Sequence, residues 1–240
     1  MHSPFVFDFI LHVLNNKKNY QPPVEIEILR KQFLNDDEEI KLVELGAGSR
    51  KGNSSIKKVS SIAATALKNK KLAQVLFRLA RHYQPGNIIE LGTSLGITTA
   101  YLASSHSNAT VYTIEGNPQI RKKAMEGFDQ LGLKNIHSFQ GNFDDVVPGV
   151  LERAGRVDLG YIDGNHRLEP TLRYFHWMLE RIEPHSILVF DDIHWSREME
   201  EAWEQVKSHP SVQYTIDIFF LGFVFFRKEF RLKQDFTIRF

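Results

Sequence analysis

An α/β fold with a mostly parallel sheet is predicted by three features of the 240-residue chain. From residue 70 onward, short apolar runs alternate with longer segments of helical periodicity. A glycine turn over residues 90–96 joins the first apolar run to a helical segment. Near the end, the apolar runs 212–219 and 222–227 are close enough for a hairpin, so the last strand should be antiparallel to its neighbour. Such alternation is typical of βαβ units.

Each element follows from this periodicity in chain order. A first helix is expected over 4–15, because Phe5, Phe9 and Val13 share one face, and a polar, irregular stretch follows over 16–60. Further helices are expected at 60–68, 70–83, 97–104, 117–131, 145–154, 168–181 and 196–208. Parallel strands are expected at 87–91, 110–115, 135–139, 157–163 and 186–191. With the hairpin, these strands form a Rossmann-like, seven-stranded sheet with helices on both faces.

Three regions of the chain are expected. Residues 1–69 form a helical and loop extension that covers the functional site, and residues 70–228 form the α/β domain. Residues 229–240 are a tail or an edge strand. The segment Arg227–Phe240 alternates charged and aromatic residues, which leaves an edge strand, a dimer contact and a loose tail open. A homodimer is therefore one of the open alternatives.

Composition excludes several classes of function. The net charge of +1 gives no electrostatic argument for a nucleic-acid partner, and the absence of cysteine excludes thiolate zinc sites and a cysteine nucleophile. No apolar run approaches the length of a membrane span. The apolar N-terminal segment contains Asp8 and His12, so it is an amphipathic helix and not a signal peptide. We expect a cytoplasmic protein without a membrane partner.

The glycine turn indicates the kind of ligand. Its pattern is E-x-G-x-x-x-G, formed by Glu90, Gly92 and Gly96, whereas a dinucleotide fold has G-x-G-x-x-G. An acid just before the turn repels a pyrophosphate and suits a cationic ligand. This pattern favours S-adenosylmethionine (SAM) over a dinucleotide.

A second acid lies at the expected distance from the turn. The strand Thr110–Ile114 ends in Glu115, about 20 residues after the turn, where an acid usually accepts hydrogen bonds from a ribose diol. The alternative is that Glu115 only caps the helix that begins near Pro118. We favour the ribose role because strand, acid and glycine turn occur together.

A second glycine-rich segment resembles the turn. The sequence Glu44–Ser49 reads ELGAGS, but polar residues follow it instead of an apolar helix. We interpret Gly46–Ser55 as a loop that closes over a bound substrate, and not as a nucleotide turn.

Acids and histidines follow the fourth and fifth strands. Asp163 and His166 follow one strand, and Asp191, Asp192 and His194 end or follow the next. Because the carboxyl ends of parallel strands meet at one edge of a sheet, these side chains should gather there. Carboxylate oxygens favour Mg²⁺, Mn²⁺ or Ca²⁺ over zinc. The alternative is that the acids cap the helices that follow.

Together these motifs resemble the class I SAM-dependent methyltransferases, over about residues 70–228. Within that class the chain is similar to the metal-dependent O-methyltransferases of the catechol and caffeoyl-CoA type. It is also similar to bacterial sugar and macrolide O-methyltransferases with an IDGxH and DD signature. The resemblance implies O-methyl transfer from SAM to a small hydroxylated molecule, with the help of a divalent cation such as Mg²⁺.

The resemblance also assigns site residues. It implies that the glycine turn binds the methionine part of SAM, through Glu90, Gly92, Thr93 and Gly96. It further implies that Glu115 binds the ribose, that the segment with Asn142 and Phe143 contacts the adenine, and that Asp163 also contributes to SAM binding. It implies that Asp163, Asp191 and Asp192 bind the metal. His166 stands where catechol-type enzymes have a lysine base, and His194 matches a histidine of the sugar-modifying enzymes. We favour His194 as the catalytic base and keep His166 as the alternative.

Other functions remain open. The same fold supports aminopropyl transferases and hydroxylase-like relatives, and a SAM-binding module without catalysis is a third alternative. The glycine spacing disfavours a dinucleotide oxidoreductase. Nothing in the sequence identifies the methyl acceptor.

Overall fold

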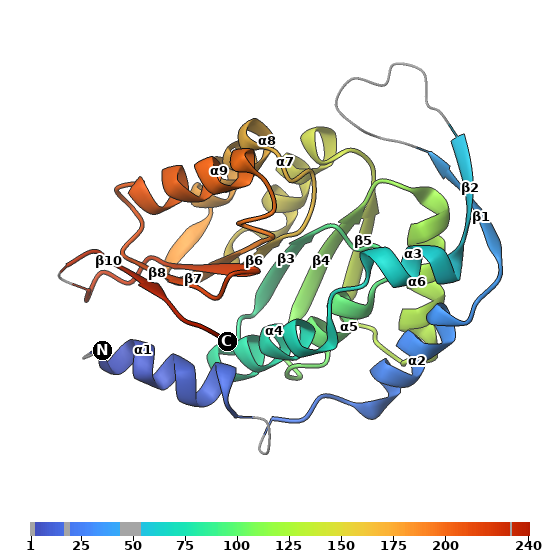
Figure 1. The fold of residues 1–240 in the computed structure, drawn as a ribbon, viewed down its shortest axis with the longest axis horizontal. Coiled ribbons are helices and arrows are strands. Elements are labelled where there is room, and N and C mark those ends of the chain that lie inside the picture. The colour runs from blue at the N-terminus through green and yellow to red at the C-terminus, as the bar shows by residue number, and fades with distance from the viewer. Residues whose placement is uncertain (1–2, 17–19, 44–53, 231) are drawn as a thin grey trace. The chain divides into compact units, whose positions relative to one another are not determined.

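The computed structural model describes residues 3–16, 20–43, 54–230 and 232–240 (Figure 1). The chain divides into two compact units. Unit 1 comprises Met1–Gly86 and Thr93–Asn142, and unit 2 comprises Asn87–Gly92 and Phe143–Phe240. The chain therefore passes from unit 2 to unit 1 within the glycine turn, between Gly92 and Thr93.

Unit 1 begins with the helix predicted over 4–15. Helix α1 (Pro4–Phe9) starts at Ser3, whose side chain accepts a hydrogen bond from Val6 N at 3.4 Å, and it continues as the π-helix η1 (Ile10–Leu14). Arg78 of α4 (Lys70–Tyr83) is buried and donates to the carbonyl oxygens of Val13 and Leu14. This guanidinium satisfies carbonyl groups that the end of a helix leaves without a partner.

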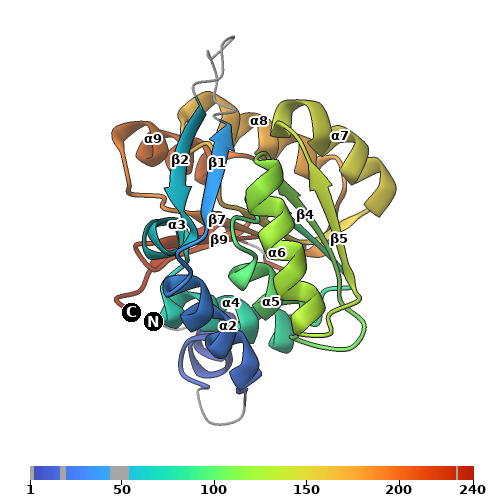
Figure 2. The ribbon, with the colours of Figure 1, turned by 90° about the vertical axis from the view of Figure 1, so that its right-hand side faces the viewer.

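The prediction that residues 16–60 are irregular is wrong. This stretch contains helix α2 (Val24–Leu34) and the antiparallel strands β1 (Glu39–Val43) and β2 (Ser54–Lys58). Figure 2 shows the β1–β2 pair beside helix α6 (Pro118–Gln130). The backbone N–H of Lys41 in β1 donates to the side-chain Oε1 of Gln119 in α6 at 2.5 Å. The charged and proline residues of this stretch obscure its apolar stripe of Ile26, Leu29 and Phe33. Most of the predicted Gly46–Ser55 loop lies outside the described residues.

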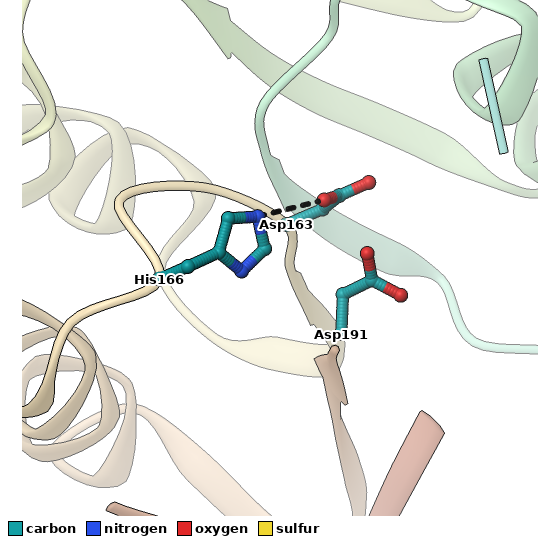
Figure 3. Close-up of side chains that lie close together, drawn as sticks. All are labelled: Asp163, His166 and Asp191. Carbon is teal, nitrogen blue, oxygen red and sulfur yellow. Dashed lines mark ion pairs between the residues drawn. The ribbon is translucent and has the colours of Figure 1, made fainter. Parts of the chain in front are cut away.

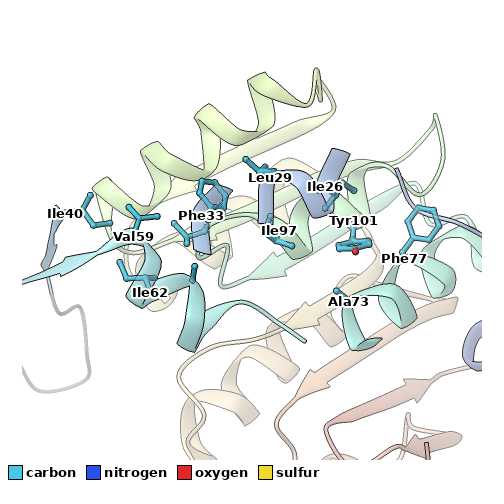
Figure 4. Close-up of a cluster of buried hydrophobic side chains, with 13 residues drawn as sticks. Ile26, Leu29, Phe33, Ile40, Val59, Ile62, Ala73, Phe77, Ile97 and Tyr101 are labelled. Carbon is cyan, nitrogen blue, oxygen red and sulfur yellow. The ribbon is translucent and has the colours of Figure 1, made fainter. Parts of the chain in front are cut away.

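The remaining elements of unit 1 agree with the predicted alternation. They are α3 (Val59–Ala66), α5 (Ile97–Ala103), β4 (Thr110–Glu115), α6 and β5 (Ile136–Gln140), with β4 and β5 parallel. Helices α2, α3, α4 and α5 contribute to one apolar cluster (Figure 4). Its members include Ile26, Leu29, Phe33, Val59, Ile62, Ala73, Phe77, Ile97 and Tyr101. This cluster holds α5, and with it the end of the glycine turn, against the N-terminal helices.

Unit 2 contains the other strands and three helices. In chain order they are β3 (Asn87–Leu91), α7 (Phe143–Ala154), β6 (Val157–Ile162), α8 (Leu168–Leu179), β7 (Ile182–Asp191), α9 (Arg197–Ser208), β8 (Tyr214–Asp217), β9 (Leu221–Phe225) and β10 (Gln234–Thr237). The pairs β3–β6 and β6–β7 are parallel, and β9 is antiparallel to both β7 and β8. Helix α8 packs against α9 and β6 (Figure 1). The predicted terminal hairpin is confirmed.

The main sheet has eight strands, in the order β10-β8-β9-β7-β6-β3-β4-β5. The mostly parallel α/β fold is confirmed, and the predicted count of seven strands is too low by one. The additional strand is β10, which lies at the edge of the sheet and pairs in parallel with β8. Thr215 Oγ1 donates to Asp235 Oδ1 at 2.6 Å across this pair. The structure shows an edge strand over Gln234–Thr237 within this segment, and a dimer contact stays a prediction.

Among the described residues, no helix combines the length and the apolar character that a membrane span requires. The assignment of residues 1–69 as a covering extension stays a prediction.

Candidate active site

The part of the glycine turn that lies in unit 1 depends on backbone conformations that few residues adopt. Ser94 and Gly96 have positive φ angles of 47° and 78°, and Gly96 N donates to Thr93 O at 2.9 Å. A Cβ atom at Gly96 would lie 2.5 Å from Cε1 of the Phe128 ring. The second glycine of the motif is thus required by its φ angle and by its close contact with α6.

Glu115 holds this turn. Its Oε2 accepts a hydrogen bond from Ser94 N at 2.8 Å, and its Oε1 accepts one from Asn117 N at 2.9 Å. Burial raises the pKa of the Glu115 carboxyl, and these backbone donors oppose that rise. The cap of α6 is Asn117, whose side chain accepts from Gln119 N and Ile120 N. Glu115 therefore fixes the turn to the end of β4.

Thr93 and Asn142 are the other predicted cofactor-binding residues in unit 1. Thr93 is buried, its N–H donates to Ile114 O at 3.1 Å, and its hydroxyl lies 2.5 Å from that of Thr113. Asn142 is half-buried and follows Gly141, whose N–H donates to Glu115 O. Both positions are thus connected to the end of β4.

In unit 2, strand register places acids on one face of the sheet. Glu90 of β3 is paired with Tyr161 of β6, and Tyr161 is paired with Val189 of β7. Side chains two residues apart on a strand share a face, so Asp163 and Asp191 continue this face beyond Tyr161 and Val189. Glu90, Tyr161 and Asp191 have no exposed surface.

Asp163, His166 and Asp191 form what we call the acid cluster (Figure 3). One possible ligand atom from each residue lies within 4.8 Å of the others, and His166 Nε2 is 3.6 Å from Asp163 Oδ1. Asp191 is buried, whereas the side chains of Asp163 and His166 are 21% and 31% exposed. Two carboxylates and an imidazole, partly open to solvent, are a donor set that suits a divalent cation.

Two glycines allow the chain segments around Asp163 to approach closely. Gly92 has a φ angle of 104°, and an added Cβ atom would lie 1.9 Å from Asp163 O. A Cβ atom at Gly164 would lie 2.6 Å from Cε2 of Phe143, the first residue of α7. Gly92 therefore belongs to the site through its contact with Asp163, and Phe143 through its contact with Gly164.

Asp192 and His194 occupy the loop after β7. Asp192 has a φ angle of 52°, its N–H donates to Phe220 O at 2.7 Å, and within the described chain it is not part of the acid cluster. His194 Nε2 lies 2.8 Å from Asp217 Oδ2, and the imidazole stacks on Phe219. Of the two candidate histidines, the structure places His166 in the acid cluster and pairs His194 with Asp217.

Sequence reasoning missed Asp217 and Tyr161. Asp217 ends β8, and the hydroxyl of Tyr161 donates to Asp163 Oδ2 at 2.9 Å. Asp217 follows the same rule as the other strand-end acids, and Tyr161 lies two residues before Asp163, on the same face of its strand. Both signals were present in the sequence.

The family model of a methyltransferase domain matches residues 89–193. This part of the chain is therefore similar to a methyltransferase domain. It includes the glycine turn, Glu115 and all three predicted metal acids, and it ends one residue before His194.

A curated relative also matches part of the chain. A catechol O-methyltransferase of Niastella koreensis is 31% identical over 118 residues, which cover 48% of this chain and 52% of the relative. The chain thus matches about half the length of this curated relative.

Two solved structures resemble the whole fold. A methyltransferase of Podospora anserina, with S-adenosylhomocysteine (SAH) bound, has a TM-score of 0.67 at 12% identity, and the match covers 95% of this chain and 98% of that one. An O-methyltransferase of Bacillus cereus in complex with SAH has a TM-score of 0.63 at 16% identity, with 92% and 97% covered. At such identities the likeness shows the fold of the methyltransferase domain alone.

Proposed function

We propose that this protein transfers a methyl group from SAM to a hydroxyl of a small acceptor, with the help of a divalent cation. The observation that carries this proposal is the acid cluster at the ends of β6 and β7, inside the part of the chain that is similar to a methyltransferase domain. The name of the Niastella relative supports O-methyl transfer, and the SAH bound to the Podospora and Bacillus structures supports SAM as the donor.

The methyl donor would be bound by the residues of the glycine turn and its surroundings. Glu115 already accepts backbone N–H groups, those of Ser94 and Asn117 among them, and a carboxylate has further lone pairs that can accept the hydroxyls of a ribose. Gly92 and Gly96 allow the backbone conformation of the turn, and Glu90 would supply negative charge for the sulfonium. Asn142 and Phe143 would contact the adenine.

The cation would be held by Asp163 and Asp191, with Asp192, the residue after β7, as a further acid. The oxygen-rich donor set fits Mg²⁺ or Mn²⁺. When bound, the cation would lower the pKa of an acceptor hydroxyl and orient it.

The proposed reaction is an in-line displacement. The acceptor oxygen would attack the methyl carbon of SAM, the bond from that carbon to sulfur would break, and SAH would leave. The hydroxyl proton would pass to an imidazole. Holding both reactants in line supplies much of the rate enhancement, because it removes the entropic cost of their encounter.

Two histidines are candidates for the base. The sequence favours His194, and its pairing with Asp217 would orient the ring. The geometry adds an argument for His166, because this ring lies beside Asp163 in the acid cluster. The turnover of the single variants His194→Ala and His166→Ala would show which histidine is the base.

Exposed aromatic side chains near His194 suggest the class of acceptor. Trp195 follows His194 and is 75% exposed, and Phe219, 61% exposed, stacks on the His194 ring. Phe220, which is half exposed, packs edge-on against Phe219. Aromatic faces of this kind bind planar rings, so we propose a phenolic acceptor in preference to a sugar.

The experiment is product analysis after incubation with SAM. Purified protein, Mg²⁺ and a panel of catechols, other phenols and sugars should give an acceptor that is heavier by one methylene unit, together with SAH. SAM binding without any product would favour the non-catalytic module. In parallel incubations, an aminopropyl group transferred from decarboxylated SAM, or an oxygen atom gained by the acceptor in the presence of O₂, would favour the other reaction types.

A further inference from the structure

Tyr161 is a buried phenol surrounded by acids. It lies on β6, where its register partner on β3 is Glu90, and it has no exposed surface. The negative charges of Asp163, Asp191 and Glu90 all act on it. An apolar side chain would fill such a position without the energetic cost of burying a hydroxyl. The buried hydroxyl of Tyr161 is therefore expected to have a specific role.

The hydrogen bond that this hydroxyl donates indicates what that role is. Tyr161 Oη donates to Asp163 Oδ2 at 2.9 Å, while the other oxygen, Oδ1, faces His166 at 3.6 Å. The two oxygens of Asp163 thus have different partners. One is held by the protein interior, and the other faces a member of the acid cluster.

The phenol is suited to remain a donor. A phenol hydroxyl has one proton to donate, and Asp163 Oδ2 accepts it. A protonated phenol supports a neighbouring carboxylate by hydrogen bonding and is a poor metal ligand itself.

We propose that Tyr161 is a positioning residue, which fixes the carboxylate of Asp163 so that its Oδ1 is presented for cation binding. This inference rests on the proposed cation site. Residues that orient a metal ligand typically change metal affinity about 10–100-fold when they are removed.

The test is Mn²⁺ affinity, measured by electron paramagnetic resonance on Tyr161→Phe. The substitution keeps the ring and removes only the hydroxyl, and we expect Mn²⁺ to bind about 10–100-fold more weakly. Tyr101→Phe is the matched control, because Tyr101 is also fully buried and donates to a carboxylate, Glu27 Oε1, that is no part of the acid cluster. Tyr101→Phe should bind Mn²⁺ like the wild type.

A double-mutant cycle with Asp163→Asn separates positioning from a general structural effect. If Tyr161 acts through Asp163, Tyr161→Phe should cause little further loss of Mn²⁺ affinity in the Asp163→Asn background. Fully additive losses would overturn the inference, because they would mean that Tyr161 acts independently of Asp163.

The remaining outcomes distinguish this inference from the proposal on which it rests. Wild-type affinity in Tyr161→Phe would overturn the positioning role and leave the cation site intact. An equal loss in Tyr101→Phe would also overturn it, since the effect would then come from any buried phenol. Absence of Mn²⁺ binding to the wild type would overturn the cation site itself, and the inference with it.

Discussion

At the scale of single residues, Glu115 is the clearest link between the fold and the proposed methyl donor. Its two oxygens connect the glycine turn to the end of β4. Glu115→Ala should weaken SAH binding by about 1–3 kcal/mol, because the ribose loses an acceptor and the turn loses its support. Calorimetry measures this loss, with the surface variant Glu126→Ala as the control. Unchanged affinity in Glu115→Ala would contradict the assignment.

Glu115 should also make stability depend on pH. Its pKa in the folded state is raised above the ordinary 4.5, chiefly by burial. Its contribution to stability is therefore fully present below pH 4.5 and is lost as the pH rises through the raised pKa. Urea unfolding of the wild type and of Glu115→Gln, across this range, should show the wild type losing stability relative to the variant. A relative gain for the wild type would contradict the raised pKa.

The two histidines lead to a prediction about turnover. Changing the histidine that serves as the base to alanine should lower the turnover of the enzyme about 10²–10⁴-fold, whereas the affinity for SAM should not change. His194→Ala and His166→Ala, measured side by side under saturating substrates, identify it. Near-normal turnover in both variants would mean that neither imidazole accepts the proton.

At the scale of the elements, the close approach of β3 to the end of β6 depends on Gly92. A Cβ atom there would lie 1.9 Å from Asp163 O, at a φ angle of 104°. Gly92→Ala should therefore lower the free energy of unfolding by about 3 kcal/mol or more.

Gly149→Ala is a control for which the expected change in stability has the opposite sign. It lies inside α7, where an added Cβ atom meets no other described atom within 4 Å. Gly149→Ala should raise stability by about 0.5–1 kcal/mol, because alanine favours the helix. Urea unfolding measures both variants, and equal effects would contradict the proposed steric cause.

The elements differ in how far the sequence reveals them. The central strands, such as β3, β6 and β7, are apolar runs bounded by turns, and all of them are predicted. The hairpin of β1 and β2 contains lysines and serines, and the edge strand β10 pairs on one side alone, so neither has the apolar run of a central strand. Their pairing depends on tertiary contacts that sequence periodicity does not encode.

At the scale of the whole molecule, the position of the acids was predictable and their partners were not. Asp163 and Asp191 follow adjacent parallel strands, and chain topology alone brings such ends together. The pairing of His194 with Asp217 depends on β8 and β9, whose register no local pattern specifies. The place of His166 depends on a loop in which Asn165 and His166 both have positive φ angles.

The central claim is that a divalent cation at the acid cluster assists O-methyl transfer from SAM. Transfer of label from methyl-labelled SAM to a phenolic acceptor, followed with Mg²⁺, with excess chelator, and after Mg²⁺ is restored, tests this claim most directly. We predict that the chelator abolishes transfer but leaves SAM binding intact, and that Mg²⁺ restores transfer. Undiminished transfer in excess chelator would contradict the account.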